Sequence, residues 1–148
     1  MNKAQAKSLW SALSACTSKT HAPFNHVCVH DRVIYATDGC VLHRIEGLYA
    51  PGSVFAALYG KYCVYAPCVD FLDKVLTYKV GSKDFISMSD YFDTAQVMKA
   101  LRVHKAAGAK YIQLVPAQTC WAPPLIIHSE IPANHGSIII TSAIQGLR

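Results

Sequence analysis

The sequence predicts an α+β fold in a single domain, and three observations support this. The chain has 148 residues, within the range of a single domain. It is 52% hydrophobic and only 16% charged, which suffices for a buried core and excludes intrinsic disorder. Finally, a helix followed by a meander of three short strands occurs in the first third and again in the last third. We therefore expect two helix-plus-β-meander halves with antiparallel sheets.

The first half begins with an amphipathic helix over 4–16, where apolar residues recur at helical spacing. Three β-rich runs follow, at 24–30, 33–37 and Cys40–Ile45. Asp38-Gly39 is typical of a tight hairpin turn between the last two runs.

The last half repeats this order. Thr94 is the expected N-cap of a helix through about Ala106, and Gly108 is its expected stop. Strands are predicted at Tyr111–Val115, Leu125–Ser129 and Ser137–Ile144. The breaks between them are assigned to Pro116, Pro123-Pro124 and Asn134-His135-Gly136.

The middle of the chain has a weaker pattern. It favours a strand at 61–66, a helix at 69–78, a turn at Gly81-Ser82 and a short strand at 85–88. It also holds a dense set of aromatic and apolar residues, for which we expect core positions, with a partner-binding surface as the alternative: Tyr49, Phe55, Leu58, Tyr59, Tyr62 and Tyr65.

Two stretches resemble a known family. Residues 33–42, with Ala36-Thr37-Asp38-Gly39 at their centre, resemble the "ATDG-x-x-L" hairpin of bacterial sliding clamps, the β subunit that holds a replicative polymerase on DNA. Residues 93–144 resemble the end of a clamp domain. The resemblance implies one clamp-like domain over 1–148. Its half-motifs lie at about 4–48 and 84–144, with an insertion at 50–82. A second alignment would match 61–78 to the other half-motif and leave 94–144 irregular.

The resemblance implies that the helices lie on one face and meet DNA phosphates without reading bases. The cations on the two predicted helices would then bind duplex DNA: Lys3, Lys7, Lys99, Arg102 and Lys105. The net charge of +5 permits such contacts without requiring them, and a solvated helix face remains the alternative for the three later cations.

The function implied by the resemblance is that of a non-catalytic processivity or DNA-tethering factor. The expected partners are duplex DNA, a DNA polymerase or other replication protein, and further copies of the chain. About six copies would complete a ring, closed by edge strands, with 137–144 as the expected edge. The alternative is a monomeric or dimeric protein-interaction module on the same fold. A phage or mobile element is the expected source.

The sequence predicts neither an enzyme nor a metal protein. It contains no nucleophile elbow, phosphate-binding loop or dinucleotide glycine pattern. Its closest carboxylate pairs, Asp70 with Asp73 and Asp90 with Asp93, are better explained as a solvated face beside Lys74 and as helix caps. His26, Cys28 and His30 alternate along one predicted strand and could approach zinc with His43 or Cys40, but the spacing matches no common zinc module. We therefore expect no cofactor or metal.

The six cysteines, Cys16, Cys28, Cys40, Cys63, Cys68 and Cys120, form no C-x-x-C pair and are expected to be reduced and mostly buried. No membrane-spanning run and no secretory signal is visible, so we expect a cytoplasmic protein, in the host cytoplasm if phage-encoded.

Overall fold

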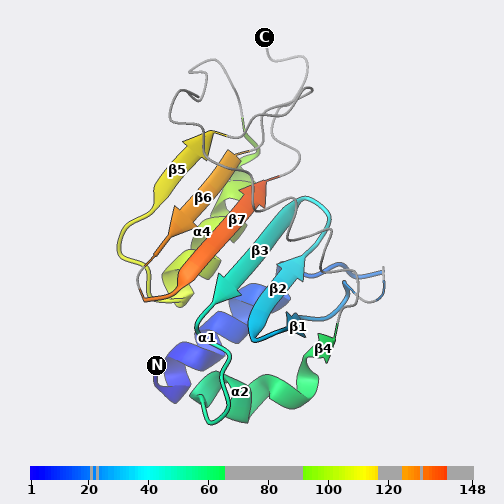
Figure 1. Ribbon diagram of the computed structural model, residues 1–148. Coiled ribbons are helices and arrows are strands. Elements are labelled where there is room, and N and C mark those ends of the chain that lie inside the picture. Colours follow the sequence, from blue (N-terminus) through cyan, green and yellow to red (C-terminus); the bar gives the residue numbers. More distant parts are fainter. Residues whose placement is uncertain (21, 23, 66–91, 117–124, 131, 140–148) are drawn as a thin grey trace.

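The computed structural model describes residues 1–20, 22, 24–65, 92–116, 125–130 and 132–139 (Figure 1). The helices are α1 (Lys3–Ser14), α2 (Val54–Tyr59), the 3-10 helix η1 (Gly60–Tyr62) and α4 (Thr94–Ala106). The strands are β1 (Cys28–His30), β2 (Val33–Thr37), β3 (Val41–Glu46), β4 (Val64–Tyr65), β5 (Gln113–Pro116), β6 (Leu125–Ser129) and β7 (Asn134–Ile139). The α+β class is confirmed.

The described strands form one sheet of seven, in the order β4-β1-β2-β3-β7-β6-β5. The meanders β1-β2-β3 and β5-β6-β7 meet at an antiparallel pairing of β3 with β7, which runs from Val41 opposite Ile139 to Glu46 opposite Asn134. The helix-plus-meander order in each half is therefore confirmed. The expected antiparallel pairing is found within both meanders. The two halves nevertheless share one mixed sheet, because β3 pairs with β7 and β4 joins β1 in parallel.

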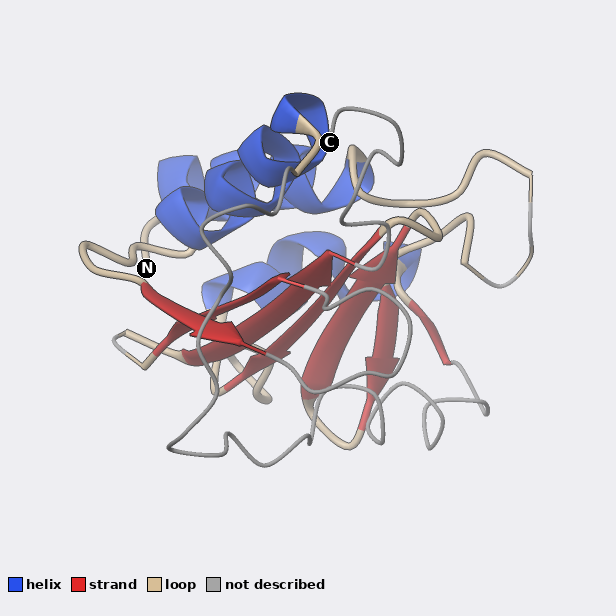
Figure 2. Cartoon of the chain, turned by 90° about the horizontal axis from the view of Figure 1, so that it is seen from above, coloured by secondary structure: helices blue, strands red, loops and turns tan. Residues whose placement is uncertain are grey.

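Helices α1 and α4 pack against each other on one face of the sheet (Figure 2). Leu9 and Leu13 of α1 lie in the same buried cluster as Ile34, Ile45 and Val103. This cluster forms because α1 places apolar residues on one side at helical spacing, while the strands place theirs on alternate positions. The expected position of these two helices, on one face, agrees with this packing.

The opposite face of the sheet is also buried. Tyr35, Leu42, Ile126 and Ile138 cluster there with Cys28. Both faces of the sheet are therefore buried at β2, which explains why Val33–Thr37 is a nearly continuous hydrophobic run and not a strict alternation.

The ends of the two long helices are set by local signals. Asn2 and Gln5 form a reciprocal capping box at the start of α1. The N-cap of α4 is Asp93, whose carboxylate accepts from the Gln96 amide, and not Thr94. Asp93 is the better N-cap because the positive end of the helix dipole also stabilises its negative charge. Gly108, whose φ is +96°, follows the C-cap of α4 and ends this helix as predicted.

Two predictions for the last strand are wrong. Asn134-His135-Gly136 was expected to break the chain, but these residues form the first half of β7. The last strand was also the expected edge of the sheet, but β7 pairs with β3 on one side and β6 on the other. Pairing on both sides supplies the backbone hydrogen bonds that offset a poor local β-propensity. The edges of the described sheet are β4 and β5.

The middle segment differs from its prediction. Helix α2, capped by Ser53, and helix η1 occupy 54–62, where no helix was expected, and β4 is confined to Val64–Tyr65. The predicted helix at 69–78, the turn at Gly81-Ser82 and the strand at 85–88 lie outside the described residues. So do the Pro123-Pro124 break and the charged residues Asp70, Asp73 and Lys74.

Candidate functional site

The outer side of the helix layer carries only positive charge. Helices α1 and α4 contain five cations and no acidic residue over their 12 and 13 residues. Lys3 and Lys7 are exposed on α1, and Arg102 and Lys105 are exposed on α4. Because α1 and α4 pack side by side, these four cations belong to one helix layer.

Lys99, the fifth predicted cation, has a partner within the chain. Its ammonium lies 3.3 Å from a carboxylate oxygen of Asp38, whose side chain is largely covered. The other oxygen of Asp38 accepts from the amides of Cys40 and Val41, as predicted for a residue that shapes its own turn. Lys99 therefore joins α4 to the β2–β3 hairpin, and its charge is partly neutralised.

A cluster of buried histidines lies where the two halves of the sheet meet under α4. His43 of β3, His135 of β7 and His104 of α4 are each at most 1% exposed. His43 lies between Val41 and Ile45 on its strand, and His135 precedes Ser137 by two positions, so the strand period directs both imidazoles toward the helix. Sequence reasoning placed His43 in a different group and missed His104 and His135.

The cluster is hydrogen bonded across elements distant in the sequence. Nδ1 of His43 lies 2.9 Å from Nε2 of His135. The ring of His104 bridges two serine hydroxyls, with Nδ1 2.9 Å from Ser129 and Nε2 2.8 Å from Ser137. The rings of His104 and His135 are stacked, 3.6 Å apart and 13° from parallel.

Burial holds these imidazoles in the neutral form. Desolvation, followed by the proximity of His104, lowers the pKa of His43 from 6.5 to about 3. Desolvation and the nearby His128 lower the pKa of His104 to about 4. The pKa of His135 is also lowered well below 6.5, by burial first and then by its histidine neighbours.

This arrangement fits a hydrogen-bonded core better than a metal centre. One nitrogen from each of the three histidines lies within 4.8 Å of the others, close enough to raise the question of a metal ion. However, both nitrogens of His104 are engaged by serines, and stacked parallel rings cannot both direct a lone pair at one ion.

The metal set considered from the sequence does not assemble. β1 begins at Cys28, so His26 lies before the strand and is exposed beside Asn25. His30 packs against Tyr65, with ring centroids 5.1 Å apart, and His43 belongs to the buried cluster.

The aromatic residues of the middle segment divide between core and surface. Phe55 is buried, and Tyr59 stacks on Trp10 with the rings 4.6 Å apart. Tyr62 and Tyr65 are instead 53% and 62% exposed. A hollow of about 430 Å³ beside Tyr62 is bordered by residues of α1, the chain before β1, and η1. The expectation of core positions is thus confirmed for Phe55 and wrong for Tyr62 and Tyr65.

The four described cysteines are in no disulfide, which agrees with the prediction of reduced thiols. Cys16 and Cys28 are buried, and Cys40 and Cys63 are half-buried. Burial raises the pKa of Cys16 to about 12 and that of Cys63 to about 11, so neither is a reactive thiolate at neutral pH. Cys68 and Cys120 lie outside the described residues.

Comparison with known proteins finds no match: no family model, no curated protein and no solved structure is similar to this chain. In the described part of the chain, no helix is long and apolar enough to cross a membrane. A functional assignment therefore depends on the chain's own residues.

Proposed function

We propose that the protein is a non-catalytic, clamp-like DNA-tethering or processivity factor that binds duplex DNA without sequence preference and acts as an oligomer. The observation that carries this proposal is the helix layer: α1 and α4 pack together, and every charged residue within them is a cation. A DNA polymerase or another replication protein would be the partner held on DNA.

The chemistry of this layer suits phosphate contacts. Lysine and arginine on the outside of helices reach phosphate oxygens but present no fixed pattern of donors and acceptors to base edges. The absence of acidic residues within the two helices removes the repulsion that would oppose the DNA backbone. The helix-plus-meander order, present in both halves, further supports a clamp-like domain.

Salt dependence of DNA binding tests the proposal. We expect a fluorescein-labelled duplex of arbitrary sequence to bind with a log–log salt slope of about −3.6 if four cations contact phosphates. Lys7→Gln and Arg102→Gln should each make the slope shallower by about 0.9. Lys99→Gln should change the slope less, because Asp38 already pairs with Lys99.

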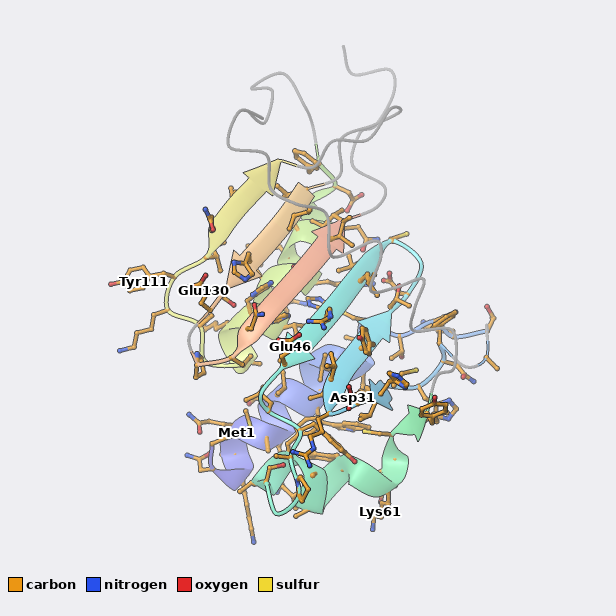
Figure 3. All side chains as sticks on the ribbon, viewed as in Figure 1. Met1, Asp31, Glu46, Lys61, Tyr111 and Glu130 are labelled. Carbon is orange, nitrogen blue, oxygen red and sulfur yellow. The ribbon has the colours of Figure 1, made fainter. Side chains whose placement is uncertain are left out.

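Lys61→Gln is the matched control. Lys61 is exposed on η1 and belongs to neither α1 nor α4 (Figure 3). If Lys61→Gln weakens binding as much as Arg102→Gln does, the charge of the whole protein and not the helix layer binds DNA. If the wild-type protein ignores duplex DNA at low salt, the proposal fails.

The alternative function, a monomeric or dimeric protein-interaction module, is favoured by one observation. The exposed Tyr62 ring lies beside the hollow bordered by Trp10 and Lys61, which together offer aromatic and cationic contacts to a peptide. A Tyr62→Ala variant that loses binding to a replication protein, while the wild-type chain shows no affinity for DNA, would establish this function instead.

A further inference from the structure

We propose that the β5 edge pairs with the β5 edge of a second copy about a two-fold axis, so that the helix layers of both copies face the same side. This inference goes beyond the proposed function by naming the interface and its symmetry, and its consequence for DNA binding rests on that function. It starts from an apolar edge left uncovered.

The apolar layer of the sheet continues to this edge, where its side chains are exposed. Leu114 of β5 lies directly opposite Ile127 of β6, so both side chains are on the face that packs against α4. Ile127 is fully buried, whereas Leu114 is 54% exposed. Exposing a leucine next to a closed core forfeits apolar burial, which a neighbouring strand would restore.

The chain leading into β5 extends this surface. Tyr111 is 87% exposed and Ile112 is 42% exposed, and Tyr111 projects from the side of the molecule opposite to Lys61 (Figure 3). The stretch from Tyr111 to Pro116 contains no charged residue. Edge strands of monomeric proteins are normally protected by charges, by a bulge or by a covering segment. In the described part of the chain, β5 has a strand on its β6 side alone.

A second copy fits this edge because antiparallel pairing is self-complementary. A strand rotated by 180° about an axis normal to the sheet lies antiparallel to itself, and the two copies exchange identical contacts. A register centred on Gln113 would place Ile112 of one copy opposite Leu114 of the other, on the face of the sheet that packs against α4. Ile112 and Leu114, both exposed in the single chain, then cover each other across the interface.

The other edge is less suited to pairing. β4 is only two residues long in the described chain, so head-to-tail joining of β4 to β5 would be limited to Val64 and Tyr65. Symmetric β5 pairing uses a longer edge on both sides.

The symmetry has a consequence for the cationic layer. An axis normal to the sheet leaves its faces unexchanged, so α1 and α4 of both copies would lie on one side of a continuous sheet. The number of exposed helix cations available to one duplex would double, and two linked sites bind more tightly than one through their effective concentration.

Mass in solution tests the interface without DNA. By sedimentation or light scattering over roughly a hundredfold range of concentration, the wild-type chain should be a dimer at the upper end. Leu114→Lys should weaken association by about tenfold or more, because it places a charge at the centre of the contact. Tyr65→Lys, at an exposed aromatic position on the other edge strand, β4, is the matched control and should leave the dimer intact. Circular dichroism should show both variants folded.

Two other results of the mass measurement would overturn the β5 interface. If the wild-type chain stays monomeric, β5 does not pair with a second copy. The same conclusion follows if β5 binds only a different protein. A larger assembly that is sensitive to Tyr65→Lys indicates head-to-tail pairing. DNA binding is scored separately: a dimer that ignores DNA contradicts only the proposed function, and a monomer that binds DNA with a salt-dependent affinity contradicts only the β5 interface.

Discussion

The buried histidine cluster predicts that the protein loses stability in mild acid. His43, His104 and His135 are neutral in the fold, whereas each imidazole in the unfolded chain has its ordinary pKa near 6.5. Below pH 6.5 the unfolded chain therefore binds more protons than the folded chain, and the folding equilibrium shifts toward unfolding. The loss should level off near pH 3 to 4, where His43 and His104 take up protons in the folded state.

The size of the stability loss follows from the difference between the pH of the experiment and the unfolded pKa of 6.5. At pH 5 each histidine that is neutral in the fold and free to protonate when unfolded costs about 2 kcal/mol relative to pH 8. Three such residues cost about 6 kcal/mol, a large part of the roughly 5–15 kcal/mol that stabilises a typical domain. Urea unfolding followed by circular dichroism, at several pH values between 8 and 5, would measure this loss.

Variants of the histidine cluster test whether these residues cause the loss of stability at low pH. His43→Leu combined with His135→Leu removes both partners of one hydrogen bond and should reduce the loss at pH 5 to about 2 kcal/mol. His104→Gln retains groups that can bond Ser129 and Ser137 but cannot titrate, and should reduce the loss by about 2 kcal/mol. His26→Gln, at an exposed site, is the control. A pH profile unchanged in both cluster variants would refute the reasoning.

Three further outcomes are expected. Because the imidazoles bond to one another and to serines, dialysis against a chelator should leave the melting temperature unchanged, and one equivalent of zinc per chain would contradict this. In the native protein at pH 7.5, Cys16 and Cys63 should resist alkylation until urea exposes them, as mass spectrometry of digested samples would show; rapid labelling would contradict their raised pKa. Gly108→Ala should destabilise the protein by more than about 1 kcal/mol in chemical unfolding, because φ is positive and the added Cβ would lie 3.2 Å from Pro132. Gly52→Ala, with positive φ but open space, should cost less, and equal losses would show that the Pro132 contact is unimportant.

The local elements can be predicted from neighbouring residues alone. α1 and α4 follow from helical spacing of apolar residues with a cap or a terminal glycine, and the β2–β3 hairpin follows from Asp38-Gly39. These signals depend on neighbours within a few residues, which the sequence displays directly. The cationic character of both helices was visible for the same reason.

Features that depend on partners distant in the sequence become visible only in the folded chain. β3–β7 pairing turns Asn134-His135-Gly136 from an expected break into a central strand, and it leaves β5 at the edge of the described sheet in place of the last strand. The same pairing brings His43 to His135, 92 positions apart, under a helix that supplies His104. No local pattern marks such a cluster, because its stability comes from hydrogen bonds and burial that exist only once the two halves have joined.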